Sequence, residues 1–188
     1  MANEVVQRRL ASPWRVIGWG IAVAIVLAPL VAMQLQAPGV NWTLGDFIFA
    51  IVLIGGVGLL LELAVRVSAS WAYRGGVALA LAAGFLLIWI NGAVGIIGDE
   101  DNPANLVFMA IIAMAVAGAI VAGGKAALMA RAMAVAAVAQ ALVGAIVFAI
   151  DAGASAPPGP VKLLILIEGF AAMWLGSSLL FRKAAAES

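Results

Sequence analysis

The chain has 188 residues, of which 66% belong to the apolar set and only 10% are charged. An average soluble domain is about half apolar and about a quarter charged, and its outer shell must be wetted. This composition excludes an ordinary soluble protein and predicts an integral membrane protein in contact with the lipid bilayer. The net charge of +1 gives no reason to expect a nucleic-acid partner, and the length suits one transmembrane domain over residues 1–188.

The chain contains neither Cys nor His. Their absence removes disulfides, thiol chemistry and nearly all zinc, copper and haem sites. It also removes the usual general base near neutral pH. Because the sequence shows no pairing of a nucleophile with a base, we expect no catalytic residue, no cofactor and no metal site, and the sequence favours a protein that is not an enzyme.

Six apolar segments, each near the ~20 residues that cross a bilayer core, follow one another along the chain. The first is too long for the apolar core of a signal peptide, so we expect a spanning helix in which Pro29 is tolerated as a kink. The connections are short, so successive helices should be antiparallel neighbours; the Ala-rich connection at 124–131 could instead stay helical. The expected spans are residues 16–35, 46–65, 76–97, 104–123, 132–150 and 161–181.

The charges are distributed unequally between the two sides that six spans would create. One side holds nine of the ten basic residues, and the other holds Lys162 with most of the acidic loop residues. By the positive-inside rule both termini should be cytoplasmic. The basic residues of the cytoplasmic side are Arg8, Arg9, Arg15, Arg66, Arg74, Lys125, Arg131, Arg182 and Lys183.

Cations recur at nearly equal intervals and divide the chain into three consecutive αα-hairpins, at about 15–66, 74–125 and 131–183. Any three short-looped hairpins that span one bilayer have similar lengths, which is sufficient to explain the interval. A true triplication with a pseudo-threefold axis along the membrane normal is the alternative. The fold class predicted is therefore all-α, a six-helix transmembrane bundle.

Glu168 is the most unusual charged residue, because it lies about seven residues inside the sixth predicted helix. An ionised carboxylate at that depth costs several kcal/mol unless it is paired, neutralised or in contact with water. Residues 172 and 176 on the same helical face are Ala and Gly, so Glu168 should point into the bundle. It is either a proton or cation site or a hydrogen-bonded clasp between helices.

Asn91 and Gln140 are the expected partners of Glu168 in a candidate intramembrane polar site. Each lies on a helical face with small residues, and an amide in such a face commonly bonds to a neighbouring helix. A purely structural role explains both residues as well. Gln140 belongs to an i, i+4 series with Ala132, Ala136 and Gly144.

The other acidic residues have simpler interpretations. Glu62 stands one turn before Arg66, in the order that favours an ion pair on a helix surface. A capping box is predicted where Asp46 follows Thr43, and Asn102-Pro103 should begin a helix. A weak acidic mouth on the outer side, which would concentrate cations without binding a specific metal, is predicted from Asp46, Asp99, Glu100, Asp101 and Asp151.

Three stretches carry a resemblance to known proteins: Asn41-Trp-Thr-Leu-Gly-Asp-Phe47, Leu60-Leu-Glu-Leu-Ala-Val-Arg66, and residues 91–106, Asn-Gly-Ala-Val-Gly-Ile-Ile-Gly-Asp-Glu-Asp-Asn-Pro-Ala-Asn-Leu. In them the chain resembles a family of small bacterial inner-membrane proteins with several spans and no assigned mechanism. The resemblance covers roughly residues 15–150 and implies a multi-pass protein of the bacterial inner (cytoplasmic) membrane.

Two functions of different classes remain open. The sequence favours a non-catalytic membrane protein that packs against a partner protein or against itself as a homo-oligomer through its Gly and Ala faces. The alternative is a small transporter or channel-like protein for protons or cations that uses Glu168 with Asn91 and Gln140.

Overall fold

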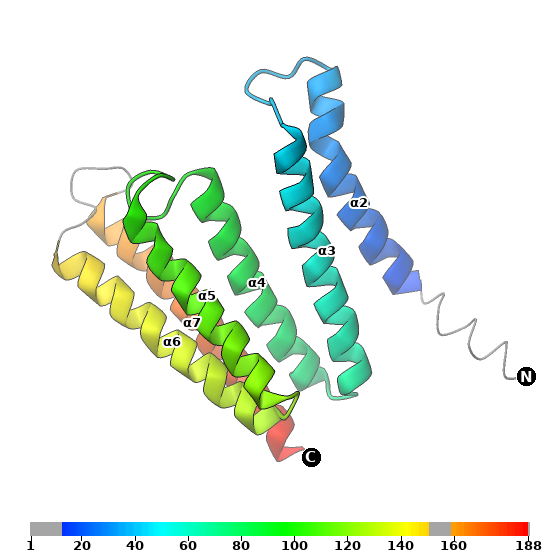
Figure 1. Cartoon of the computed structure of the whole chain (residues 1–188). Coiled ribbons are helices and arrows are strands. Elements are labelled where there is room, and N and C mark those ends of the chain that lie inside the picture. Colours follow the sequence, from blue (N-terminus) through cyan, green and yellow to red (C-terminus); the bar gives the residue numbers. More distant parts are fainter. Residues whose placement is uncertain (1–12, 151–158, 188) are drawn as a thin grey trace, which may run out of the picture. The chain divides into compact units, whose positions relative to one another are not determined.

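The computed structural model describes residues 13–150 and 159–187, and every regular element in these residues is a helix. Six of the helices are long and apolar enough to cross a membrane, as predicted, so the chain is an all-helical, multi-pass membrane protein. A short 3-10 helix, η1 (Pro103–Asn105), precedes the fourth of them. The six helices, with the labels of Figure 1, are α2 (Pro13–Gln34), α3 (Leu44–Val67), α4 (Trp71–Ala93), α5 (Leu106–Ala122), α6 (Ala126–Ala149) and α7 (Pro160–Ala186).

Several helix ends differ from the predicted spans. Helix α4 begins at Trp71 instead of residue 76, because the Ser70 side chain caps its first turn. Of the two possibilities for residues 124–131, the structure supports the helical one from residue 126 on: α6 already begins at Ala126, after a tight turn in which Gly123 and Gly124 both have positive φ. Basic side chains near helix ends can extend to the headgroups, so a cation in the sequence does not mark the end of a helix.

Contacts between Cα atoms divide the chain into two compact units, residues 1–62 and residues 63–188, and each is described by itself. In the first unit, the ring of Trp19 near the start of α2 lies against Gly58 near the end of α3. A Cβ atom at Gly58 would lie 3.0 Å from that ring. The absence of a side chain at Gly58 therefore makes room for the Trp19 ring between α2 and α3, which run in opposite directions here.

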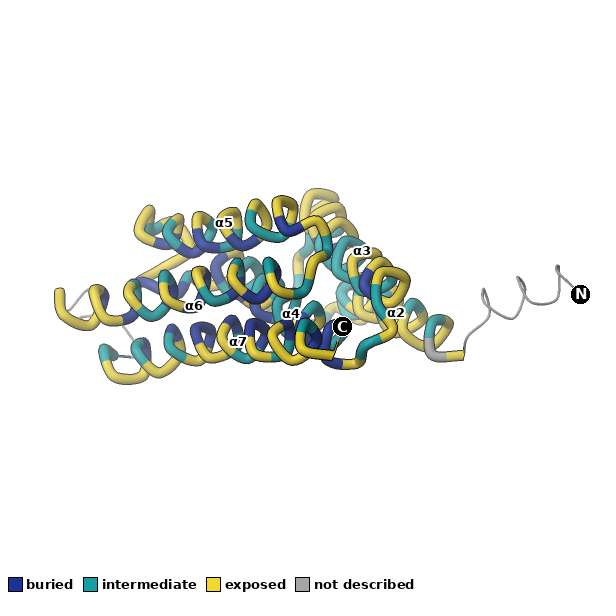
Figure 2. The backbone as a smooth tube through the Cα atoms, turned by 90° about the horizontal axis from the view of Figure 1, so that it is seen from below, coloured by how far each residue is buried: buried dark blue, intermediate teal, exposed yellow. Residues whose placement is uncertain are grey.

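The second unit contains helices α4 to α7. Helix α6 packs against both α5 and α7, and α7 also packs along α4. Figure 2 shows the buried positions of α5, α6 and α7 on the sides where these helices face one another. One series of buried residues along α7 alternates at intervals of four and three, the spacing of knobs-into-holes packing. Its members are Leu163, Ile167, Phe170, Trp174, Ser177, Phe181 and Ala184, and Ala171 and Ser178 are buried beside them.

Two serines of α7 tie the second unit together. The Ser177 hydroxyl donates a hydrogen bond of 2.7 Å to the carbonyl of Gly76 in α4. The next residue, Ser178, donates a hydrogen bond of 2.7 Å to the carbonyl of Ala130 in α6. Both hydroxyls are buried, so each satisfies its donor on the backbone of a neighbouring helix.

Candidate functional site

Gln140 is the most conspicuous polar residue in the second unit. Its side chain is fully buried on α6, at 0% exposure. Neither its amide oxygen nor its amide nitrogen has a hydrogen-bond partner among the described residues. A buried polar atom without a hydrogen-bond partner lowers the stability of the fold by about 1–3 kcal/mol. The amide of Gln140 therefore destabilises the folded protein unless a further group forms hydrogen bonds with it.

Asn91 and Trp174 carry two further atoms of this kind. Asn91, near the end of α4, donates from Nδ2 to the carbonyl of Leu87 at 2.7 Å, but its Oδ1 has no partner within the described part of the chain. Trp174 of α7 is 2% exposed, and its indole Nε1 also has no partner there. Asn91 was predicted as a site residue, whereas Trp174 was not. The signal that could have indicated it is a Trp far from the helix ends, whose N–H needs a partner when buried.

Glu168 lies at the contact between α6 and α7. It is half-buried, and its carboxylate lies directly against Gly144, where an added methyl group would overlap Oε1. Within the described residues it makes no hydrogen bond to Asn91 or Gln140, the partners that the sequence suggested. The glycine at position 144 therefore provides the space in which the carboxylate of Glu168 lies.

The register of the helices sets the depth of these groups. Helices α6 and α7 run antiparallel, with Gly144 beside Glu168 and Ala130 bonded to Ser178. This register places Gln140 between the levels of Glu168 and Trp174. Helix α7 also runs antiparallel to α4, with Trp174 near Gly84 and Ser177 bonded to Gly76, so Asn91 is at about the level of Glu168. The four polar side chains thus occupy one stretch of the second unit, nearer the end where α4 stops and α7 begins.

The turn between α4 and α5 is organised by Asn105. Its Oδ1 accepts hydrogen bonds from the backbone N–H groups of Ile96 at 3.1 Å and Ile97 at 2.8 Å. Its Nδ2 donates to the carbonyls of Ile97 at 3.3 Å and Asp99 at 2.7 Å. The cap predicted at Asn102 is confirmed, since its side chain accepts from the N–H of Ala104. Both the side-chain oxygen and the side-chain nitrogen of Asn105 thus have hydrogen-bond partners within the turn, so Asn105 is a structural residue of this turn.

The residues of the predicted acidic mouth have local roles. Asp46 forms the capping box with Thr43, accepting from the backbone N–H of Thr43 at 2.7 Å at the start of α3. The consecutive carboxylates Asp99, Glu100 and Asp101 are exposed in the turn after α4, and Asp151 lies outside the described residues. In the described parts of the chain, no group of three or more Asp or Glu side chains is placed to hold a metal ion.

A separate charged cluster lies in the first unit. Arg15 of α2 bonds to both carboxylate oxygens of Glu62 in α3, with Nε at 3.1 Å from Oε1, and Trp19 Nε1 donates to the same Oε1 at 2.9 Å. The predicted pairing of Glu62 with Arg66 stays a prediction. Local spacing could not indicate the partner Arg15, because 47 residues separate it from Glu62.

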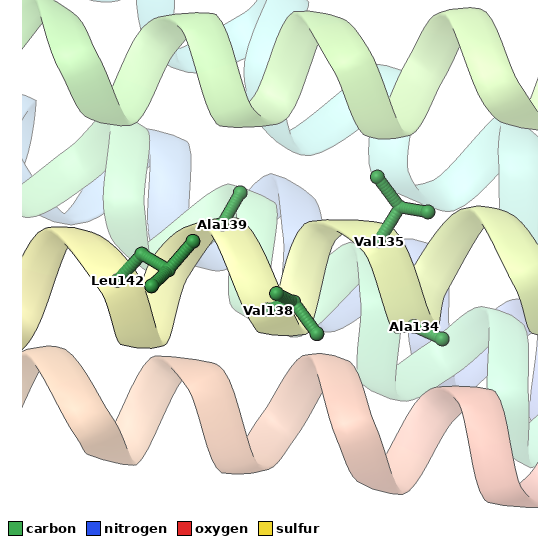
Figure 3. A pocket seen from close by; sticks show the side chains of 5 residues that line it. All are labelled: Ala134, Val135, Val138, Ala139 and Leu142. Atoms are coloured by element: carbon green, nitrogen blue, oxygen red, sulfur yellow. The ribbon is translucent and has the colours of Figure 1, made fainter.

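The outer face of α6 carries an apolar groove of about 420 Å³. Its lining residues, shown in Figure 3, are Ala134, Val135, Val138, Ala139 and Leu142. Three of them are large and more than half exposed, so this face suits lipid acyl chains. The groove has no polar lining residue and is not part of the polar site.

Comparisons of the chain with models of protein families, with curated proteins and with solved structures found no match.

Proposed function

We propose that this protein spans the bacterial inner membrane as three consecutive hairpins, with both termini in the cytoplasm. The support is the charge distribution, in which nine of ten basic residues fall on one side of six spans. The resemblance of residues 15–150 to small bacterial inner-membrane proteins supports the choice of membrane.

We further propose that the second unit is a small transporter or channel-like module for protons or cations, with Glu168, Asn91 and Gln140 in its path. The observation that carries this proposal is the amide of Gln140, fully buried at a packed helix contact with both polar atoms unpartnered. Polar groups at membrane depth are costly and commonly belong to ion or proton pathways. The carboxylate of Glu168, about one turn away on the facing helix, supplies the ionisable group.

The test is flux in proteoliposomes that contain the purified full chain. We expect the wild-type protein to dissipate an imposed proton or cation gradient and Glu168→Gln to reduce this flux to the level of empty liposomes. Glu187→Gln is the matched control, because it makes the same change at an exposed position after the end of α7 and should keep wild-type flux. Absence of wild-type flux for protons and for every cation tested would overturn the transport proposal.

A packing role is the second candidate, in which the protein associates with a membrane partner or with itself. The buried bonds from Ser177 to Gly76 and from Ser178 to Ala130 support it, because they show that α4, α6 and α7 are held as a fixed structural unit. In this case Glu168→Gln should leave every activity unchanged. A single mass equal to that of one chain, measured in mild detergent and in native nanodiscs, would contradict self-association.

A further inference from the structure

The buried side-chain atoms of the candidate intramembrane polar site that lack a partner include both hydrogen-bond acceptors and hydrogen-bond donors. Two are acceptors, the side-chain oxygens of Asn91 and Gln140, and two are donors, Gln140 Nε2 and Trp174 Nε1. When it is ionised, the half-buried carboxylate of Glu168 adds further acceptor capacity. All four unpartnered atoms belong to side chains that are at least nine-tenths buried, so bulk water does not satisfy them.

This mixture does not suit a metal cation. Hard cations that give up their hydration shell are held by a set of oxygen ligands, from carboxylates, amide oxygens or backbone carbonyls. The N–H groups of Gln140 and Trp174 present the positive ends of their dipoles and would repel such an ion. A site for Na⁺ or K⁺ would also leave both donors unpartnered, at a cost of about 1–3 kcal/mol each.

Water matches both kinds of atom, because each molecule donates and accepts hydrogen bonds. Water molecules at these groups would accept from Trp174 and from the Gln140 amide nitrogen and would donate to the Gln140 and Asn91 oxygens. The carboxylate of Glu168, which lies about level with Asn91 and next to Gly144, would also accept from water.

We propose that the cargo of this site is the proton, carried over water, and that metal cations are not transported; this inference rests on the proposed transport function. A hydronium ion donates a proton to the Glu168 carboxylate, which yields a neutral carboxylic acid and one water molecule. The acid then returns this proton to a water molecule on the other side of the site, restoring the carboxylate. Gln140 and Trp174 exchange no proton and are positioning residues that hold the water.

The experiment compares ions in the same proteoliposomes. Proton entry is followed with an internal pH-sensitive dye, and uptake of Na⁺ and K⁺ is followed with radioactive tracers, each driven by its own gradient. We expect proton flux that neither requires nor is accompanied by movement of Na⁺ or K⁺. Flux of Na⁺ or K⁺, alone or coupled to protons, would overturn the inference and leave the transport proposal standing, whereas absence of any flux would overturn both.

Trp174→Phe adds a test of the donor, because it keeps an aromatic ring in the core but removes the indole N–H and the volume of the second ring. We expect a several-fold lower proton flux in a protein that still folds, with a melting temperature lowered by the lost volume. If the N–H group had no part in holding water, flux would be unchanged, and that result would contradict the role assigned to Trp174. Gln140→Met removes both amide atoms at similar volume and should lower proton flux further, while Gln34→Met, at an exposed position at the end of α2, should have no effect.

Discussion

Gln140 and Gly144 lie one turn apart on α6. At these two positions the interior of the second unit contains polar groups instead of closely packed apolar side chains. A leucine or methionine at position 140 would fill this place without leaving polar atoms unpartnered. Any side chain at position 144 would displace the carboxylate of Glu168. The sequence around both residues is otherwise Ala-rich and apolar, so these two positions set the chemistry of the region.

The space at Gly144 gives the first prediction. Gly144→Ala should be clearly less favourable for stability than Gly84→Ala, because the added methyl group overlaps Glu168 Oε1 and the Glu168 side chain must shift. Thermal unfolding in detergent measures this effect. Gly84→Ala is the matched control, since its new Cβ would meet only the Trp174 ring at an ordinary distance of 3.9 Å, and it should be neutral or slightly stabilising.

A second variant tests the cause of the Gly144→Ala effect. Gly144→Ala should be less unfavourable when it is introduced into Glu168→Ala, where the overlapping group is absent. An equal effect of Gly144→Ala in the wild type and in Glu168→Ala would show that Glu168 does not lie against position 144.

Residues whose chemistry conflicts with their surroundings could be singled out from the sequence. Asn91, Gln140 and Glu168 stand out in apolar segments, but the structure shows no hydrogen bond of Glu168 to Asn91 or Gln140, and their shared site stays a prediction. The role of Asn105 was missed, because it depends on where the chain turns back after two glycines. The link between Glu62 and Arg15 was missed because it depends on which helices meet.

At the scale of the helices, the number of spans could be predicted and several of their ends could not. Mean apolarity over about 20 residues is a property of each segment alone, so six spans follow from it. Helix ends depend on caps and turns, such as Ser70 before α4 and the two glycines before α6. The packing of α7 against α4 depends on distant contacts such as that of Ser177 with Gly76, which no local pattern records.

The pairing of α2 with α3 gives a prediction at this scale. Glu62→Gln keeps an acceptor oxygen but removes the negative charge that faces Arg15 and should lower stability slightly, because the hydrogen bonds from Arg15 and Trp19 become weaker. A double-mutant cycle with Arg15→Met, followed by thermal unfolding, should show a coupling energy clearly different from zero. Strictly additive effects would contradict a direct interaction between the two side chains.

At the scale of the whole molecule, the proposed orientation depends on charge alone and can be tested in cells. The chain contains no Cys, so single cysteines can be placed at Ala69, between α3 and α4, and at Glu100, after α4. A membrane-impermeant thiol reagent should label Glu100→Cys from outside intact cells and leave Ala69→Cys unlabelled until the cells are opened. The opposite pattern would reverse the proposed topology.

The central claim is that water reaches the buried amide at position 140 inside the second unit. Gln140→Cys tests it, with Met133→Cys as the control, because Met133 is two turns away on the same buried face of α6 and is 2% exposed. A thiol reacts as its thiolate, which forms only where water reaches it. With a small water-soluble methanethiosulfonate reagent and the folded protein in membranes, we expect modification at position 140 and no modification at position 133. A position 140 that stays unmodified in the folded protein, but reacts after denaturation, would contradict the account.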